Sequence, residues 1–264
     1  MRFPWPRWWL LTFYACIVWA VGYMIAYPAW PTLTSYTKGA LGYSQRQVLA
    51  DEMKHAETAQ AEMRNLLAKT PLSEIKANRD LFAFATAAGA SSFQTNCAPC
   101  HGRNGHGFVG YPNLNDDDWI WGGTLAEIEK TILHGIRSDH KEARVGQMPR
   151  YGTEKLLTDA QINDAAEHVL ALSAKSIDAA AALRGAVVFK DQCANCHGEQ
   201  GQGKLDQGAP NLTDGIWLYG GSREAIVESI RTGRGGAMPA WTGRLDPITL
   251  KSLTIYVHSL GGGK

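Results

Sequence analysis

The sequence lacks an excess of charge of either sign. Its 264 residues carry 26 Lys and Arg against 25 Asp and Glu, a formal net charge of +1. A strongly basic surface is therefore not expected, and we predict no nucleic-acid partner. The length allows two small domains with cores of their own, together with additional segments.

Charged residues are also missing from the whole run between Trp8 and Trp30. As a helix, this run would reach roughly 34 Å at about 1.5 Å per residue, enough to cross a hydrocarbon core of about 30 Å. A cleavable signal peptide has an apolar region of only about 7–15 residues and a small-residue cleavage site, which the following YPAWP does not resemble. We predict that residues 1–30 form an uncleaved membrane anchor in contact with lipid.

Cysteine is scarce, and its placement is specific. Of five cysteines, one lies in the apolar N-terminus and four form two C-x-x-C pairs, each followed at once by histidine. A zinc site shared by the pairs has no use for a histidine at that offset, and a thioredoxin-like motif needs a βαβ context that neither pair shows. The pattern is typical of covalent haem c attachment, and we predict two such haems, held by Cys97, Cys100, His101, Cys193, Cys196 and His197.

The C-x-x-C-H pattern suits haem for a geometric reason. Two sulfurs on one helical turn can bond the two vinyl-derived carbons of a porphyrin, and the next residue then lies over the iron as an axial ligand. Stable thioethers to haem c are made outside the bacterial cytoplasm. We therefore predict a single-pass protein of the bacterial inner membrane with its haem domains in the periplasm.

Most of the remaining chain is an internal repeat. PNLNDDDWIWGG at 112–123 matches PNLTDGIWLYGG at 210–221, and each is followed by a helical pattern, a Met-Pro pair and a second helical pattern. An insertion of about eight residues near Ser138–Val145 is the main mismatch between the copies. We predict an all-α protein, with one transmembrane helix, a linker at 31–79 containing an amphipathic stalk helix at 44–69, and two tandem cytochrome c domains at 80–175 and 179–264.

A haem iron held by histidine on one face needs a ligand on the other. Met148 and Met238 each precede proline, which blocks helix and favours an extended loop that can lay the thioether on a metal. The expected axial pairs are His101 with Met148 and His197 with Met238, although sequence order leaves open a methionine that crosses to the other haem. A histidine ligand is the alternative, and the candidates are His106, His134, His140, His168 and His258.

Ligands on both faces of each iron leave no open position for substrate, so we predict electron transfer and no catalytic residue. We also expect three tryptophans in the repeated segments to line haem walls or pack the fold. These are Trp119, Trp121 and Trp217.

Several runs together resemble a known family. PRWWLLTFYACIVWAVGYMIAYPAWP, the two C-x-x-C-H sites, APNLTDGIWLYGG, GRGGAMPAW and YVHSLGGG are similar to the membrane-anchored di-haem cytochrome c subunit (subunit III) of cbb3-type cytochrome c oxidases. The resemblance covers nearly the whole chain. Family members usually have a longer cytoplasmic segment before Pro-Arg-Trp-Trp.

The resemblance implies an electron-transfer subunit of a respiratory terminal oxidase. Such a subunit takes electrons from a donor cytochrome c and passes them towards a mono-haem cytochrome c subunit and a catalytic subunit, whose b-type haems and copper reduce oxygen to water and pump protons. The resemblance also implies that both C-x-x-C-H sites, Met148 and Met238 bind haem. It gives this chain no oxygen-reducing centre of its own.

Two other classes of function remain open from the sequence. A free-standing membrane-anchored di-haem shuttle for another reductase would carry the same motifs, because electron-carrier domains look alike whatever they feed. A di-haem peroxidase would need one haem with an open or displaceable axial site, whereas both repeats here offer a Met-Pro pair.

Overall fold

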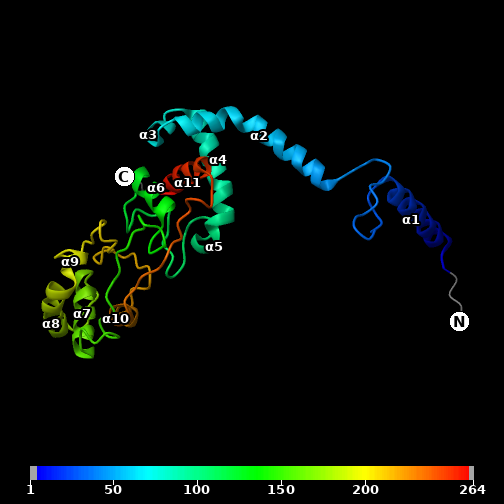
Figure 1. Cartoon of the computed structure of the whole chain (residues 1–264). Helices are drawn as coiled ribbons and strands as arrows, with labels where there is room; N and C mark the ends of the chain where they lie inside the picture. The colour runs from blue at the N-terminus through cyan, green and yellow to red at the C-terminus, as the bar shows by residue number, and fades with distance from the viewer. Residues whose placement is uncertain (1–4, 262–264) are drawn as a thin grey trace. The chain divides into compact units, whose positions relative to one another are not determined.

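The computed structural model describes residues 5–261, and within that range the only regular secondary structure is helical (Figure 1). Contacts divide the chain into two compact units, Met1–Glu62 and Met63–Lys264. The expected all-α fold is confirmed, while the outermost residues of the predicted anchor and second domain, 1–4 and 262–264, lie outside the described range. The helices are α1 (Arg7–Ala26), α2 (Gln45–Lys69), α3 (Leu72–Ile75), α4 (Arg79–Asn96), α5 (Ala98–His101), α6 (Leu125–His134), α7 (Asp159–Leu172), α8 (Ala179–Gln192), α9 (Ala194–His197), α10 (Arg223–Thr232) and α11 (Pro247–Leu260).

Helix α1 is apolar on all sides. Among the described residues it is the one helix long and apolar enough to cross a membrane. Its 20 residues give roughly 30 Å at about 1.5 Å per residue, the thickness of a hydrocarbon core. None of its side chains is buried within the chain, as expected for a helix whose apolar surface is covered by lipid.

Helix α2 matches the stalk helix expected at residues 44–69. The Ser44 hydroxyl oxygen accepts a hydrogen bond from the Gln47 amide at 3.4 Å, which satisfies one of the free N–H groups of the first turn. Most of its side chains are exposed, but Leu67 in the last turn is fully buried. The end of α2 is thereby fixed to a small core that also contains Ile75, Leu81, Ala85 and Ile255.

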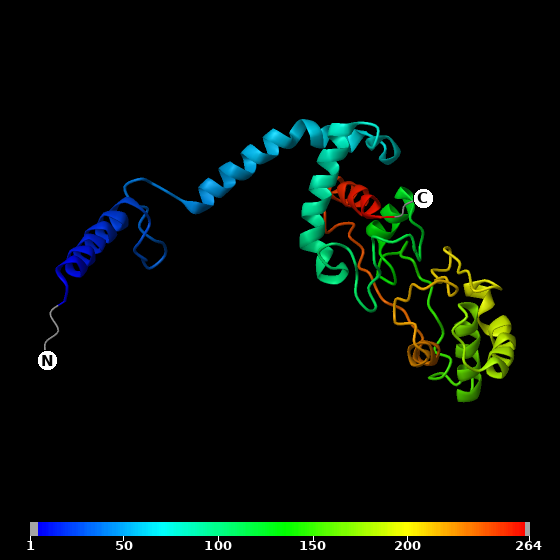
Figure 2. The same cartoon turned by 180° about the vertical axis from the view of Figure 1, so that it is seen from behind.

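In the C-terminal unit the packing order of the helices differs from their order in the sequence. Helix α11, at the end of the second repeat, packs against α4 and α6, whereas α7, at the end of the first repeat, packs against α8 and α10. Figures 1 and 2 both show these two groups. We call α4, α5, α6 and α11 the first module, and α7, α8, α9 and α10 the second module. The sequence repeats and the packed modules are therefore not the same pieces of chain.

Two glycines let the exchanged helices approach closely. Gly89 in α4 and Gly185 in α8 occupy the same position relative to the first cysteine of each motif. A Cβ atom at Gly89 would collide with the backbone carbonyl of Ser252 in α11, and one at Gly185 would collide with the carbonyl of Asp164 in α7. Each crossing therefore brings helix backbones into van der Waals contact, which any larger residue would push apart.

Each module encloses its own apolar core. A fully buried aliphatic or aromatic side chain contributes about 1.5–3 kcal/mol relative to an exposed one, so these clusters are the main source of stability. The first core contains Phe93, Ile128, Ile132, Leu250, Leu253 and Val257. The second contains Tyr151, Leu157, Ile162, Ala165, Ala166, Val169, Leu170, Phe189, Ala194, Ile226 and Ile230.

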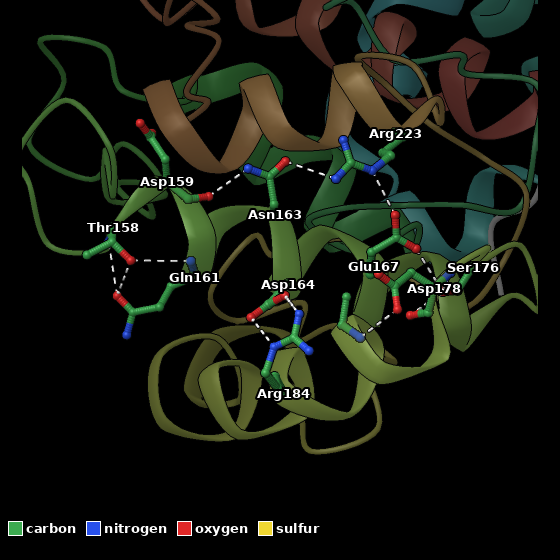
Figure 3. Close-up of polar contacts among 11 residues, drawn as sticks. Thr158, Asp159, Gln161, Asn163, Asp164, Glu167, Ser176, Asp178, Arg184 and Arg223 are labelled. Atoms are coloured by element: carbon green, nitrogen blue, oxygen red, sulfur yellow. Dashed lines mark hydrogen bonds and ion pairs between the residues drawn. The ribbon is translucent and has the colours of Figure 1, made fainter.

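Polar contacts fix α7 in the second module (Figure 3). The Glu167 carboxylate is only 2% exposed, and it accepts hydrogen bonds from Arg223 Nε of α10 at 2.7 Å and from the Ser176 hydroxyl at 2.8 Å. On the outer side, Arg184 of α8 donates to Asp164 of α7 at 2.9 and 2.6 Å. One helix of the first repeat is thus tied to two helices of the second.

Candidate functional site

The first C-x-x-C-H motif forms a single tight turn at the end of α4. Cys97 is the C-cap that follows the last residue of that helix, and residues 98–101 continue as the one-turn helix α5. The amide of His101 donates to the carbonyl of Cys97 at 2.9 Å, and Gly102 ends the turn at φ 76°, a left-handed conformation that strains any residue with a Cβ atom. The two cysteines and the histidine therefore lie on one short helical turn.

The second motif repeats this arrangement. Cys193 is the C-cap of α8, residues 194–197 form α9, and Gly198 stops the turn at φ 80°. The amide of His197 donates to the carbonyl of Cys193, again at 2.9 Å. Because two copies of one sequence adopt the same turn, local sequence determines this part of the site.

Each motif histidine is oriented by a proline carbonyl. Nδ1 of His101 lies 3.2 Å from the carbonyl oxygen of Pro112, and Nδ1 of His197 lies 3.0 Å from that of Pro210. A carbonyl oxygen only accepts, so Nδ1 carries the hydrogen and Nε2 keeps its lone pair for a metal. These prolines open the repeated PNL segments, and their role in orienting histidine was missed from the sequence because every residue type has a carbonyl.

Burial favours the neutral forms of the motif histidines and of the first cysteine of each motif. It lowers the pKa of His101 and of His197, against the opposing effect of the hydrogen bond to proline. Burial, helped by the neighbouring motif cysteine, raises the pKa of the Cys97 and Cys193 thiols to about 11. Neutral imidazole is the form that binds iron, so this environment suits the histidines to that role.

The two Met-Pro loops cross between the repeats. Met238 packs on the first core together with Cys97, and its backbone forms a bridge with Ile136, in which both N–O distances are 2.9 Å. Met148 packs on the second core together with Cys193. Packing thus places Met238 with the first motif and Met148 with the second, and this differs from the within-repeat pairing expected from sequence order.

The reason for the crossed placement is the exchange of helices. Each Met-Pro loop leads into the last helix of its repeat, and that helix belongs to the other module. The carbonyl of Met148 lies 2.7 Å from where a Cβ atom of Gly233 would stand, and Gly233 ends α10 of the second module. A glycine at this position, as at Gly135 beside Met238 in the first module, leaves room for the crossing loop.

Two tryptophans give an independent test of whether the modules fit haem. Trp119 packs on the first core and Trp217 on the second, at equivalent repeat positions. The indole Nε1 of each is buried and has no hydrogen-bond partner among the described residues. Buried donors nearly always find acceptors, and haem propionates are carboxylates that accept such bonds. With the cysteines, histidines and methionines, these unpaired donors fit the modules to haem.

The other expected residues have different surroundings. Trp121 lies under the guanidinium of Arg144, 5.2 Å from its carbon to the ring centroid. His106 lies 3.3 Å from the Asn115 side-chain nitrogen, and the His168 ring packs on Phe189 with 5.0 Å between centroids. The contacts of these two histidines place them in packing and surface roles, whereas Met148 and Met238 pack on the cores beside motif cysteines.

Comparisons with known proteins agree with this geometry. Residues 180–257 match the family model for subunit III of cbb3-type cytochrome c oxidase, residues 86–173 match cytochrome c, and residues 1–34 match the N-terminal domain of cytochrome oxidase-cbb3, FixP. The chain is 51% identical over 262 residues to the cbb3-type cytochrome c oxidase subunit FixP of Azorhizobium caulinodans, covering 99% of this chain and 89% of that one. It is 50% identical over 268 residues to subunit CcoP of Azospirillum brasilense, covering 99% and 91%.

The chain belongs to the FixP/CcoP family of cbb3-type cytochrome c oxidase subunits. As a FixP/CcoP protein it is a cytochrome c subunit of a terminal oxidase, and its cytochrome c domains imply covalently bound haem c. Two such domains are matched, in keeping with two haems. FixP/CcoP membership favours the oxidase over a free-standing shuttle or a peroxidase, and α1 fits a single-pass membrane protein.

Proposed function

We propose that the chain binds two haem c groups with crossed axial ligands, His101 with Met238 and His197 with Met148. Cys97 and Cys100 attach the first haem, and Cys193 and Cys196 attach the second. The observation that carries the proposal is that the methionine of each Met-Pro loop packs on the core beside the cysteine motif of the other repeat. Haem c supplies, when bound, a one-electron couple between ferric and ferrous iron.

The residues around each site have three tasks in this proposal. The proline carbonyls hold the histidine rings so that Nε2 faces the iron, and the apolar cores exclude water. The thioether ligands raise the reduction potential relative to a second histidine. The indole N–H groups of Trp119 and Trp217 bind the propionates.

Within the oxidase, we propose that the chain accepts electrons from a donor cytochrome c and delivers them to the mono-haem cytochrome c subunit. From there they reach the catalytic subunit with its b-type haems and copper, which reduces oxygen and pumps protons. Helix α1 holds the chain in the bacterial inner membrane with both modules in the periplasm. The support is family membership together with the apolar surface of α1.

The crossed ligands are tested in chains that keep one haem. Cys193→Ser with Cys196→Ser leaves only the first haem, and its low-spin spectrum shows that the remaining site is intact. Adding Met238→Ala should then convert that haem to a high-spin or weakly ligated form, whereas adding Met148→Ala should leave it low-spin. The opposite result would establish pairing within each repeat. The reciprocal pair of variants in a Cys97→Ser, Cys100→Ser chain provides the matched control.

The placement in the oxidase is tested on the native complex. Membranes are solubilised gently, the chain is captured by a C-terminal tag, and difference spectra are recorded with copper content and oxygen uptake. Haem b and copper that co-purify with haem c, together with oxygen uptake from a reduced donor, are the expected result. Haem c alone at two per chain, without copper or oxygen uptake, would contradict the placement.

A further inference from the structure

Two histidines and a glutamate meet at the end of α6, and none of the three belongs to a C-x-x-C-H motif. They are His134, the last residue of α6, and His140 and Glu142 in the segment that the first repeat has and the second lacks. Each offers one ligand atom, and these atoms all lie within 4.8 Å of one another. The position of His134 is occupied by Thr232 in the second repeat, so the cluster belongs to the first module alone.

The spacing of the cluster is close to that of a metal site. Nε2 of His134 lies 3.2 Å from Oε2 of Glu142, and the rings of His134 and His140 lie 4.5 Å apart between centroids. In a tetrahedral zinc site with bonds of about 2.0–2.1 Å, two ligand atoms are roughly 3.3 Å apart. One edge of the ligand set therefore has metal-site spacing, and one ligand atom from each of the three residues lies within 4.8 Å of the others.

Hydrogen bonds hold the inserted segment in the shape that creates the cluster. The Ser138 hydroxyl donates to the His134 carbonyl at 2.7 Å, and the His140 amide donates to the Ser138 hydroxyl at 3.2 Å. The Ala143 amide then donates to the His140 carbonyl at 2.9 Å. These hydrogen bonds fix the backbone that positions the ligands, which is what a specific site requires.

One ring nitrogen of the cluster is left without a partner. Nδ1 of His134 is buried and has no hydrogen-bond partner in the described part of the chain. Buried polar atoms of this kind usually interact with protein, an ordered water or an ion. An ion bound at Nε2, the nitrogen that faces Glu142, puts the hydrogen on Nδ1, which then needs a water or another acceptor.

We propose that His134, His140 and Glu142 bind a divalent transition-metal ion of the Zn²⁺ type, separate from the haem irons. Two imidazoles and one carboxylate suit Zn²⁺ or Cu²⁺, whereas Ca²⁺ and Mg²⁺ take oxygen ligands. Three protein ligands leave a fourth position for water or a partner side chain. Binding displaces the hydrogen bond of 3.1 Å from the Glu142 amide to Nδ1 of His140, because a ring that binds metal through one nitrogen carries hydrogen on the other.

The site would brace the backbone that carries Met238. The inserted segment continues to Arg144, whose carbonyl accepts from the Arg137 amide at 2.7 Å and whose amide donates to the Gly135 carbonyl at 3.1 Å. Ile136, which lies between Gly135 and Arg137 in the sequence, forms the bridge to Met238. An ion at the cluster therefore stiffens a segment that is one bridge away from the Met-Pro loop.

The test uses the full haem-loaded chain in detergent, purified with a histidine-free tag and freed of metal by a chelator. Zn²⁺ is titrated against a chromophoric competitor, and one high-affinity ion per chain is expected. His140→Ala and Glu142→Gln should each weaken this binding at least about tenfold, since even outer partners of metal sites contribute about 10–100-fold. His55→Ala, on the exposed surface of α2, is the matched control and should leave the affinity unchanged.

Three results would overturn the proposal. The first is equal affinity in the wild type and in the His140→Ala and Glu142→Gln variants, with haem spectra showing that both variants are folded. The second is an equal loss in His55→Ala, which would mean scattered binding to surface histidines. The third is the absence of a high-affinity Zn²⁺ ion in the wild-type chain.

Discussion

The first and second modules share their inner parts and differ on the outside. Both have the cysteine turn closed by glycine, the proline carbonyl on histidine, the unpaired tryptophan and the glycine at the helix crossing. Leu81 of the first module is 1% exposed because α2 and α3 cover it, whereas Ile177, at the corresponding repeat position, is 88% exposed. The repeated residues form the sites proposed to hold haem, and the residues that differ determine what each module contacts.

A second outer difference lies on α8. Leu183 and Val187, one helical turn apart, are exposed in the second module, where the first module has Ala87 and Ser91. The first module carries instead the inserted segment with Arg144 and the histidine cluster. Equal haem sites therefore sit in unequal surroundings, and each shared part can be tested by making the same change in both modules.

The largest expected effect comes from removing a pair of cysteines. Cys97→Ser with Cys100→Ser, or Cys193→Ser with Cys196→Ser, should lower the covalent haem content from two to one per chain, because each pair alone attaches one porphyrin. The pyridine haemochrome spectrum and the intact mass measure this. Loss of both haems in either variant would mean that the modules do not mature independently.

The next effect concerns the helix crossings. Gly89→Ala and Gly185→Ala should each destabilise the haem-loaded chain by about 1–3 kcal/mol, the usual range for overpacking, since the added methyl group meets a backbone carbonyl of the neighbouring helix. Denaturant unfolding measures the change. Gly215→Ala, where an added Cβ meets nothing within 4 Å, is the control and should stay within about 0.5 kcal/mol. A control as damaging as the crossing variants would refute the steric explanation.

The buried carboxylate of α7 should contribute less than a crossing and more than a surface pair. Glu167→Gln should cost about 1–2 kcal/mol, because it removes charge-assisted hydrogen bonds from Arg223 and Ser176, and Arg223 is partly exposed. The matched variant Arg184→Ala breaks an exposed ion pair and should give no resolvable change. A larger loss in Arg184→Ala than in Glu167→Gln would contradict this ranking.

The same carboxylate makes stability depend on pH. Burial favours a raised pKa for Glu167, but hydrogen bonds from Arg223, Ser176 and the Ile177 amide outweigh it and hold the pKa below the ordinary value of about 4.3. The advantage of the wild type over Glu167→Gln is therefore complete above the ordinary pKa and disappears as pH falls through the lower folded-state pKa. Unfolding curves of both proteins between neutral and acidic pH measure the difference, and an advantage that grows on acidification would refute the sign.

The smallest effect concerns the unpaired indoles. Trp119→Phe and Trp217→Phe keep an aromatic ring and remove one N–H donor each. The negative charge of the propionate is then less neutralised, and this charge stabilises ferric iron relative to ferrous iron. Each variant should lower the midpoint potential of one haem and leave the other unchanged. A potentiometric titration measures both haems, and unchanged potentials in both variants would show that the indoles bind another acceptor.

The sequence predicts the local structure well. The C-x-x-C-H turns, the stalk helix within one residue of its expected start, and the equivalence of the two repeats all follow from short motifs and spacing. The exchange of α7 and α11 does not follow from motifs or spacing, because both helices are amphipathic and either could pack on α4 or α8. What favours the observed choice is the connection at residues 173–178, since a short link between helices makes them antiparallel neighbours. The histidine cluster was also missed, because its irregular spacing has no helical period.

Because the last helices are exchanged, the first module is completed after the second module, although its cysteine motif is synthesised earlier. Once translation has passed Gly233, every element of the second module has been synthesised. The first module, although it begins earlier, waits for Pro247–Leu260. With the crossed ligands proposed above, a chain that ends before Pro247 would lack part of the haem site formed by the first cysteine motif and would keep every residue of the second.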